Sequence, residues 1–256
     1  MDEGQKDIMI RTRGDAEAFE RWLHAIHDTH LQCPGKIVFG LGNIFDVCHK
    51  FKEGYGGRVF SAVVDLAISQ TNCTWELDDC IKVWNKYFSG ENEYGHTPKT
   101  SFLDNAMAFE GKLCYHRYLS SFVLKYRALW DKIMGLHFLV FAFGKYQDFI
   151  RAPKKKKMFL KEFEGHPLVA QEVVDYVNND LTSFDENYRT HEAHGTGKLR
   201  KFAFTGGPEQ LDNPVYDIIN TKYGKYKDIA PKVFECIEYF LCLPEALELV
   251  EKKSRS

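Results

Sequence analysis

The segment covering residues 102–133 constrains the fold of this chain more than any other part of the sequence. Apolar side chains recur in it at steps of three and four for about thirty residues, which is the period of one face of an α-helix. A strand would instead alternate with a period of two. The segment therefore predicts a long helical hairpin with a continuous apolar stripe, made by Phe102, Ala106, Phe109, Leu113, Leu119, Phe122, Val123, Tyr126, Leu129, Trp130 and Ile133.

The same helical period recurs along most of the chain. Asp15 and Thr74 suit the residue that caps a helix start, and Pro167 suits the first turn of a helix. No convincing alternating strand pattern occurs, so the sequence predicts an all-α fold, a helical bundle. The further helices are predicted at residues 15–27, 59–68, 74–88, 167–188, 215–222 and 228–252.

Loops are predicted where Gly, Asn and Pro accumulate and the helical period disappears. Such stretches lie at residues 89–100, 144–157 and 205–214. The first of them predicts a boundary between an N-terminal helical region of unknown role, residues 1–95, and a second helical domain, residues 96–256.

The composition indicates a folded chain without a global positive field. Of the 256 residues, 44% are hydrophobic and 14% aromatic, which is enough to fill a core. The formal net charge is −2, so any nucleic-acid binding must come from a local patch, and a general DNA-coating role is excluded. The run from Lys154 to Lys157 is interpreted as a solvated connection or, alternatively, as a localisation or RNA-contact patch.

The expected compartment is the cytoplasm. Residues 1–6 are polar and acidic, unlike a secretory signal. The longest apolar run, residues 136–143, contains His137 and is far shorter than the ~20 residues that span a membrane, so no membrane partner is expected. Seven cysteines at irregular spacings, without a Cys-x-x-Cys pair, suit a reducing compartment.

The residues that most directly suggest chemistry follow the predicted helix at 167–188. Arg189 and His194 have four residues between them, and two glycines come next. A guanidinium can hold a phosphate oxygen bidentately, and an imidazole titrates near neutral pH and can transfer protons. Three cations complete the segment: Lys198, Arg200 and Lys201. This combination is typical of phosphate chemistry.

An Arg followed after four to six residues by a His, near a helix end in an all-helical protein, resembles the motif of the HEPN superfamily. Its active members are metal-independent endoribonucleases, so the resemblance implies neither a metal nor another cofactor. It implies that His194 activates the ribose 2′-hydroxyl or protonates the leaving oxygen, while Arg189 stabilises charge on the phosphorus. The products would be a 2′,3′-cyclic phosphate and a 5′-hydroxyl, and DNA would not be cleaved.

The resemblance also implies supporting residues. Thr190, His191 and Glu192 lie inside the motif, and Thr190 occupies a position where active members often carry Asn, Asp or His. Asp131 is the candidate for a polar residue that lines the cleft from a facing helix. Flanking phosphates would be bound by Lys198, Arg200 and Lys201.

The implied partners are single-stranded or looped RNA and a second copy of the chain. On a straight helix, Arg189 and His194 would project about 140° apart, so they could not contact one phosphate. Either the helix ends or distorts before His194, or two copies bring their motifs together, as HEPN nucleases do. The resemblance also implies a toxin or defence role. An antitoxin or other neutralising protein is then expected as a further partner.

Alternative interpretations of the motif remain open. Arg189 and His194 would also suit a helix C-terminus, where cations interact favourably with the dipole, and a non-catalytic nucleotide-binding, RNA-binding or interaction domain would then follow. His191 and His194, three residues apart, allow a metal site, although the zincin pattern His-Glu-x-x-His is not met. The Arg-to-His spacing also occurs from Arg21 to His27.

Overall fold

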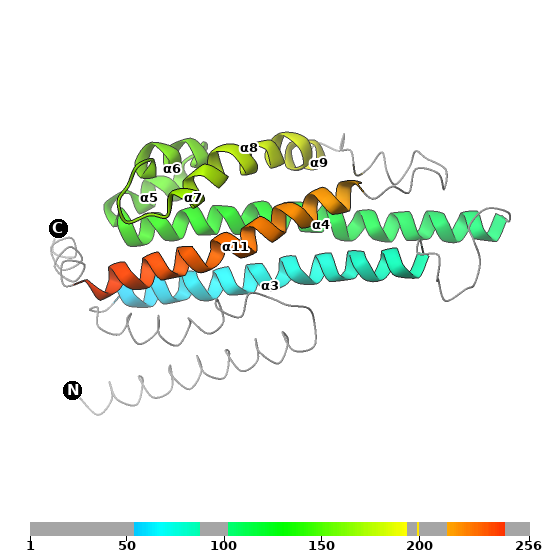
Figure 1. Ribbon diagram of the computed structural model, residues 1–256, viewed down its shortest axis with the longest axis horizontal. Coiled ribbons are helices and arrows are strands. Elements are labelled where there is room, and N and C mark those ends of the chain that lie inside the picture. Colours follow the sequence, from blue (N-terminus) through cyan, green and yellow to red (C-terminus); the bar gives the residue numbers. More distant parts are fainter. Residues whose placement is uncertain (1–53, 88–101, 194–198, 200–213, 244–256) are drawn as a thin grey trace, which may run out of the picture. The chain divides into compact units, whose positions relative to one another are not determined.

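The computed structural model describes residues 54–87, 102–193, 199 and 214–243 (Figure 1). Across these residues the elements are helices joined by short turns, and no strand occurs among them. The prediction of an all-α fold is confirmed. The helix predicted at residues 15–27 and the domain boundary predicted near residue 95 lie outside the described residues.

Helix α3, Tyr55–Tyr87, joins two segments that the sequence predicted as separate helices. The prediction was wrong because Thr74 does not cap a new helix. Its hydroxyl is hydrogen-bonded to the carbonyl of Gln70, one turn earlier, at 3.1 Å, and lies 2.6 Å from the hydroxyl of Tyr223. With its hydroxyl so engaged, and with neither Gly nor Pro between residues 69 and 74, the helix continues through.

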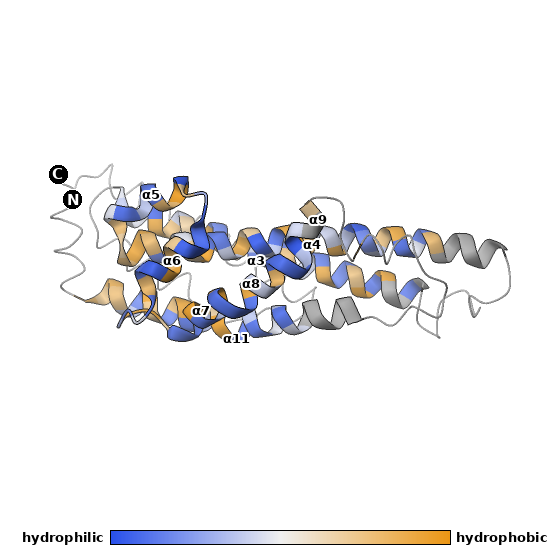
Figure 2. Cartoon of the chain, turned by 90° about the horizontal axis from the view of Figure 1, so that it is seen from above, coloured by the Kyte–Doolittle hydropathy of each residue, from blue (hydrophilic) through white to orange (hydrophobic). Residues whose placement is uncertain are grey.

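Helices α4, Phe102–Phe141, and α11, Pro214–Cys242, are also longer than predicted. The first is one uninterrupted helix where a hairpin was expected. The second joins two predicted helices and keeps Pro231 inside it. Figure 2 shows hydrophobic and hydrophilic residues alternating along these helices, as expected for elements that bury one face.

The segment predicted as an exposed connection at residues 144–157 is mostly helical. It contains η1 (Phe143–Lys145), α5 (Tyr146–Arg151) and the start of α6 (Lys155–Phe163). Phe149 is fully buried and stacks on Phe138 at a ring distance of 4.5 Å. This buried ring packs the segment against the core. The polar composition of the segment gave no indication of this contact.

The helix predicted from Pro167 begins four residues later and changes its winding twice. We call it the motif helix. It consists of α7 (Gln171–Asp175), the π-helical η2 (Tyr176–Asp180), α8 (Leu181–Phe184), the π-helical η3 (Asp185–Arg189) and α9 (Thr190–Ala193). π-helical turns are rare and occur frequently at functional sites.

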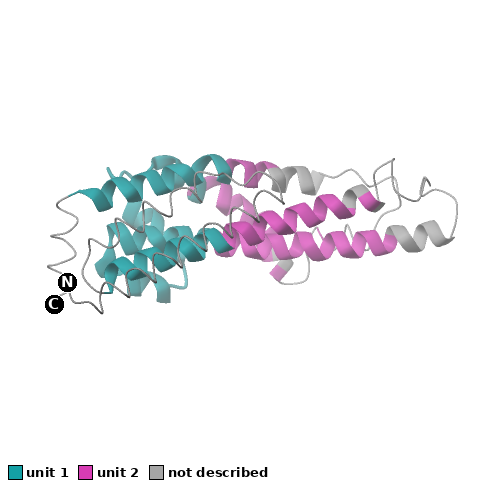
Figure 3. Cartoon of the chain, turned by 90° about the horizontal axis from the view of Figure 1, so that it is seen from below, with its two compact units in different colours: residues 1–68, 130–177, 226–256 teal, residues 69–129, 178–225 magenta. Residues whose placement is uncertain are grey.

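The chain divides into two compact units, drawn in different colours in Figure 3. Unit 1 comprises residues 1–68, 130–177 and 226–256, and unit 2 comprises residues 69–129 and 178–225. Helices α3, α4 and α11 each contribute residues to both units.

Unit 1 has an aromatic core. Trp130, which is fully buried, stacks on Tyr176 at a ring distance of 4.4 Å, and Tyr226 meets the same indole edge-on at 5.9 Å. Phe141 and Phe240 join α4 to α11 at 5.1 Å. Offset and edge-on pairs of this kind add about 0.5–1.5 kcal/mol each beyond the area they bury.

Unit 2 has its own aromatic core, built on Tyr126. Its ring packs on Phe122 at 5.3 Å, on Phe184 at 5.1 Å and on Tyr223 at 5.9 Å. In the part of α3 that belongs to unit 2, Cys73 and Cys80 are free and buried, and burial raises the pKa of both thiols. Both thiols are therefore protonated at neutral pH.

Candidate functional site

In the final turns of the motif helix, a buried residue is followed directly by an exposed one. Tyr188 is only 6% exposed and lies 5.6 Å from the ring of Phe184, and burial raises the pKa of its hydroxyl. The next residue, Arg189, is exposed, as is Thr190. Tyr188 therefore fixes this turn against the core of unit 2 while Arg189 extends into solvent.

Arg189 is the last residue of η3, where the winding is widened. The backbone N–H of Thr190 donates to the carbonyl of Asp185, five residues earlier. A helix that ends or distorts before His194 was one of two alternatives that the sequence left open, the other being two copies that bring their motifs together; η3 is a distortion that ends at Arg189. Whether the side chains of Arg189 and His194 converge stays a prediction, because His194 lies outside the described residues.

The guanidinium of Arg189 has no ion-pair partner within the part of the chain that the structure describes. Arg127, the other arginine of this region, is by contrast engaged. Its Nε lies 2.9 Å from Oδ1 and 3.1 Å from Oδ2 of Asp185, and both side chains are 14% exposed. Of these two arginines, Arg189 is the one available to an external anion.

Sequence reasoning missed the pair between Arg127 and Asp185. The two residues are 58 positions apart, on α4 and on η3. Removing one member would leave the other as a poorly solvated charge. The pair therefore fixes η3, and with it the base of the Arg189 turn, against α4. In the sequence, the only indication of this pair was the carboxylate of Asp185, one turn before Arg189.

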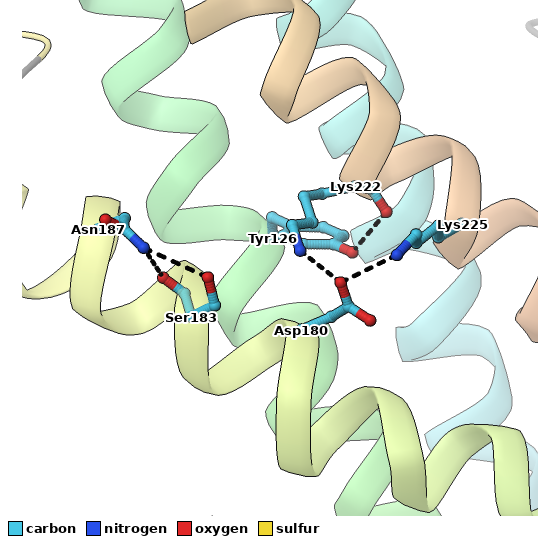
Figure 4. Close-up of polar contacts among 6 residues, drawn as sticks. All are labelled: Tyr126, Asp180, Ser183, Asn187, Lys222 and Lys225. Atoms are coloured by element: carbon cyan, nitrogen blue, oxygen red, sulfur yellow. Dashed lines mark hydrogen bonds and ion pairs between the residues drawn. The ribbon is translucent and has the colours of Figure 1, made fainter.

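A second polar cluster holds the motif helix to α11 (Figure 4). Asp180, the last residue of η2, accepts hydrogen bonds from Lys222 and, at 3.1 Å, from Lys225. Burial raises the pKa of this carboxyl, but the two ammonium groups outweigh burial and hold the pKa below its usual range. Tyr126 donates to the backbone carbonyl of Lys222 at 3.1 Å, which completes the link to α4.

Within η3, Asn187 satisfies backbone and side-chain acceptors. Its amide nitrogen donates to the carbonyl of Ser183 at 2.8 Å and lies 3.3 Å from the Ser183 hydroxyl (Figure 4). A side-chain amide of this kind can satisfy a carbonyl where the regular i to i−4 ladder changes. Asn187 therefore supports the altered winding just ahead of Arg189.

The remaining predicted site residues are divided between described and undescribed parts of the chain. Asp131 lies in the part of α4 that belongs to unit 1 and is half-buried, whereas Arg189 belongs to unit 2. His191 and Glu192 lie in α9, but their side chains are outside the described set. The three cations Lys198, Arg200 and Lys201 lie outside the described residues, so their role stays a prediction.

The described residues offer no ready metal site. Among them, no group of three or more His, Cys, Asp or Glu side chains is placed so that it could hold a metal ion. The alternative site at His191 and His194 falls on side chains outside this set and stays open. No helix in the described ranges combines the length and the apolar character that a membrane span needs.

Comparison with models of protein families, with curated proteins and with solved structures finds no match. The interpretation of the site therefore depends on its own chemistry and geometry.

Proposed function

We propose that this chain is a metal-independent endoribonuclease of the HEPN type, acting as a homodimer on single-stranded or looped RNA. The observation that carries the proposal is Arg189, an exposed guanidinium with no ion-pair partner among the described residues, at the end of a π-helical turn and five residues before a histidine. The all-α fold is compatible with this family. A cytoplasmic toxin or defence role, with a neutralising protein, belongs to the same proposal.

The proposed reaction needs only groups that the chain supplies. His194 of one copy accepts the proton of the ribose 2′-hydroxyl, and the 2′-oxygen attacks the adjacent phosphorus. Arg189 stabilises the negative charge that develops on the phosphoryl oxygens. The bond from phosphorus to the 5′-oxygen breaks, and this oxygen takes a proton from the imidazolium of the second copy. A 2′,3′-cyclic phosphate and a 5′-hydroxyl result.

The test measures cleavage of a labelled single-stranded RNA in EDTA. We expect Arg189→Ala and His194→Ala each to lower the rate about a hundredfold or more, because each removes a group that acts in the transition state. A DNA strand of the same sequence should stay intact. Arg58→Ala is the matched control, since Arg58 is also exposed but lies on α3.

Three outcomes would count against the proposal. Cleavage that survives both substitutions would assign the activity to other residues or to a contaminant. Cleavage that requires a divalent metal would favour the alternative site at His191 and His194. Binding of RNA without cleavage would favour a non-catalytic domain, an alternative to which Thr190 already points because it departs from the pattern of active members.

A further inference from the structure

Positive charge is concentrated in one short part of unit 1. Residues 145–164 contain seven Lys and Arg against three Asp and Glu, although the whole chain has a formal charge of −2. One of the acids, Glu162, is already neutralised by Lys145, whose Nζ lies 2.6 Å from its carboxylate. The remaining cations therefore create a local positive field on a chain that is otherwise acidic.

Helix α6 arranges this charge on one side. Lys154 is the N-cap residue of α6, and Lys157 and Lys161 follow it within the helix at steps of three and four, which places the three on the same side of α6. All three are exposed. None of them has an ion-pair partner among the described residues. The opposite face carries Phe159 and Phe163, both fully buried. Burial of these rings therefore orients the lysines toward solvent.

The start of α6 adds to the positive field. No acidic residue lies in its first turn, and the N-cap residue Lys154 makes no side-chain cap hydrogen bond, so the positive end of the helix dipole is not neutralised there. The ammonium of Lys155 lies 5.6 Å from the centre of the Phe149 ring, which ties this lysine to the core. Arg151, exposed at the end of α5, lies just before this turn.

We propose that the exposed cations Arg151, Lys154, Lys157 and Lys161, here called the basic face, bind the sugar-phosphate backbone of a nucleic acid. From Lys154 to Lys161 the face extends about 10 Å along the helix axis, which matches about three successive phosphates of one strand. Three aromatic residues of α5 and α6, Phe149, Phe159 and Phe163, are buried and cannot stack on bases, whereas Tyr146 of α5 is part-buried. We expect the phosphates to carry the contact, which makes it independent of sequence.

A nucleic acid suits the basic face better than an anionic membrane. An amphipathic helix that lies in a lipid surface inserts an exposed apolar face between the headgroups, in addition to the electrostatic attraction of its basic residues. The aromatic residues of α6 are buried in unit 1, and the exposed apolar side chain nearby, Ile150, is a single residue at 46% exposure beside exposed Gln147 and Asp148. Phosphates bound at the surface require no such insertion.

The basic face does not depend on the proposed cleavage, since it lies in unit 1 whereas Arg189 lies in unit 2. Its test therefore uses strands without a free 2′-hydroxyl, namely labelled single-stranded DNA and 2′-O-methyl RNA. Neither can be cut by the proposed reaction, so a failure of binding is distinguishable from a failure of cleavage. Binding is measured by fluorescence anisotropy as a function of salt.

We compare the full-length protein with the triple variant Lys154→Gln/Lys157→Gln/Lys161→Gln. Loss of three phosphate contacts should reduce the slope of log K against log salt by about 2 to 3. The matched control is Lys82→Gln/Lys132→Gln/Lys232→Gln, which changes net charge equally but removes exposed lysines paired with Asp78, Asp65 and Glu172. The control should retain the slope of the unsubstituted protein.

The proposal is overturned if the triple variant and the control have the same affinity and salt slope, or if the unsubstituted protein binds neither strand. Binding to vesicles containing phosphatidylserine, without binding to either strand, would overturn it in favour of a lipid surface. Circular dichroism and the melting temperature are measured to check that both triple variants are folded. The substituted lysines are exposed, so we expect little change in either measurement.

Discussion

His137 is a titratable residue in a fully buried environment. Its side chain is fully buried, and its ring contacts Phe159 at 5.4 Å and Phe163 at 6.0 Å. Nδ1 lies 2.8 Å from the carbonyl of Ile133, so Nδ1 carries the hydrogen and donates it. Burial lowers the pKa to about 4, the carbonyl opposes that change, and nearby His166 lowers the pKa slightly further. The ring is therefore neutral at neutral pH.

The neutral state of His137 predicts a loss of stability in mild acid. In the unfolded chain this imidazole takes up a proton near pH 6.5, whereas in the folded chain it does so only near pH 4. The unfolded state therefore binds more protons between these values, and stability falls as the pH falls through them. At pH 4.5 the loss from this one residue is about 2–3 kcal/mol.

Urea unfolding at pH 7 and pH 4.5 tests this for His137→Phe. Because phenylalanine cannot titrate, we expect the drop in unfolding free energy between the two pH values to shrink by about 2–3 kcal/mol. His116→Gln is the control, since His116 is only partly buried and lies in unit 2. An unchanged pH dependence in His137→Phe would mean that another group causes the acid sensitivity.

At the same scale, part of the candidate site could be read from the sequence. Arg189 and Thr190 are exposed, as a site at a helix end requires. The sequence places Tyr188 at the end of the helix predicted at residues 167–188, where it continues the helical spacing of the apolar residues of that segment. The partner of Asp185 was not visible, because nothing local indicates which distant cation will meet a given carboxylate.

At the scale of elements, the motif helix differs from an ordinary amphipathic helix through its two π-helical turns. The spacing of apolar residues predicts that such a segment is helical. It does not predict whether a given turn winds as α or as π, because tertiary contacts can override the local preference for α winding. Both π segments end at a charged residue, Asp180 and Arg189. Asp180 is bound to α11, whereas Arg189 has no ion pair within the described residues.

The link between η2 and α11 predicts a stability effect. Asp180→Asn removes the carboxylate that accepts hydrogen bonds from Lys222 and Lys225, and it leaves Lys222, whose side chain is 19% exposed, without that carboxylate. We expect a loss of about 1–2 kcal/mol at pH 7. Because the folded pKa of Asp180 is lowered, its contribution is present above pH 3.8 and is lost as the pH falls further.

Urea unfolding followed by circular dichroism measures this loss. The matched control is Asp175→Asn, because Asp175 is exposed on α7 and has no ion pair with a described residue. Equal stability of the two variants at pH 7 would show that the cluster in Figure 4 contributes nothing to holding the motif helix.

At the scale of the whole molecule, the two units each have an aromatic core, and the same long helices contribute residues to both units. Phe138 is fully buried in unit 1, and Phe122 is fully buried in unit 2. Truncation of such a ring removes buried apolar surface and leaves a cavity, which costs about 3–5 kcal/mol. Since α3, α4 and α11 each continue from one unit into the other, disruption of either core should be transmitted along a shared backbone.

We therefore expect Phe122→Ala and Phe138→Ala to lower the midpoint of a single unfolding transition. The measurement is urea unfolding followed by circular dichroism and by tryptophan fluorescence, whose curves should coincide. Leu124→Ala is the control, because Leu124 is 47% exposed and should cost much less. Two separate transitions, each shifted only by the substitution in its own unit, would show that the units unfold independently.

The sequence by itself determined the all-α class and the apolar faces of the long helices. Both follow from a period of 3.6 residues, which is a local property of the chain. The sequence did not determine where the helices end, because a helix end depends on which group the side chain of the capping residue is hydrogen-bonded to. Thr74 is a residue type that often caps a helix, yet the tertiary structure places the hydroxyl of Tyr223 beside its hydroxyl, and α3 continues past it.

The tertiary structure alone decided which charges are neutralised and which remain available. Arg127 and Arg189 are the same residue type, but folding brings Asp185 to the first and leaves the second exposed. Lys154 and Lys157 were predicted in a loop, and only the burial of Phe159 and Phe163 places them on one side of α6 together with Lys161. Such pairings join residues far apart in the chain, so they follow from packing and not from any local pattern.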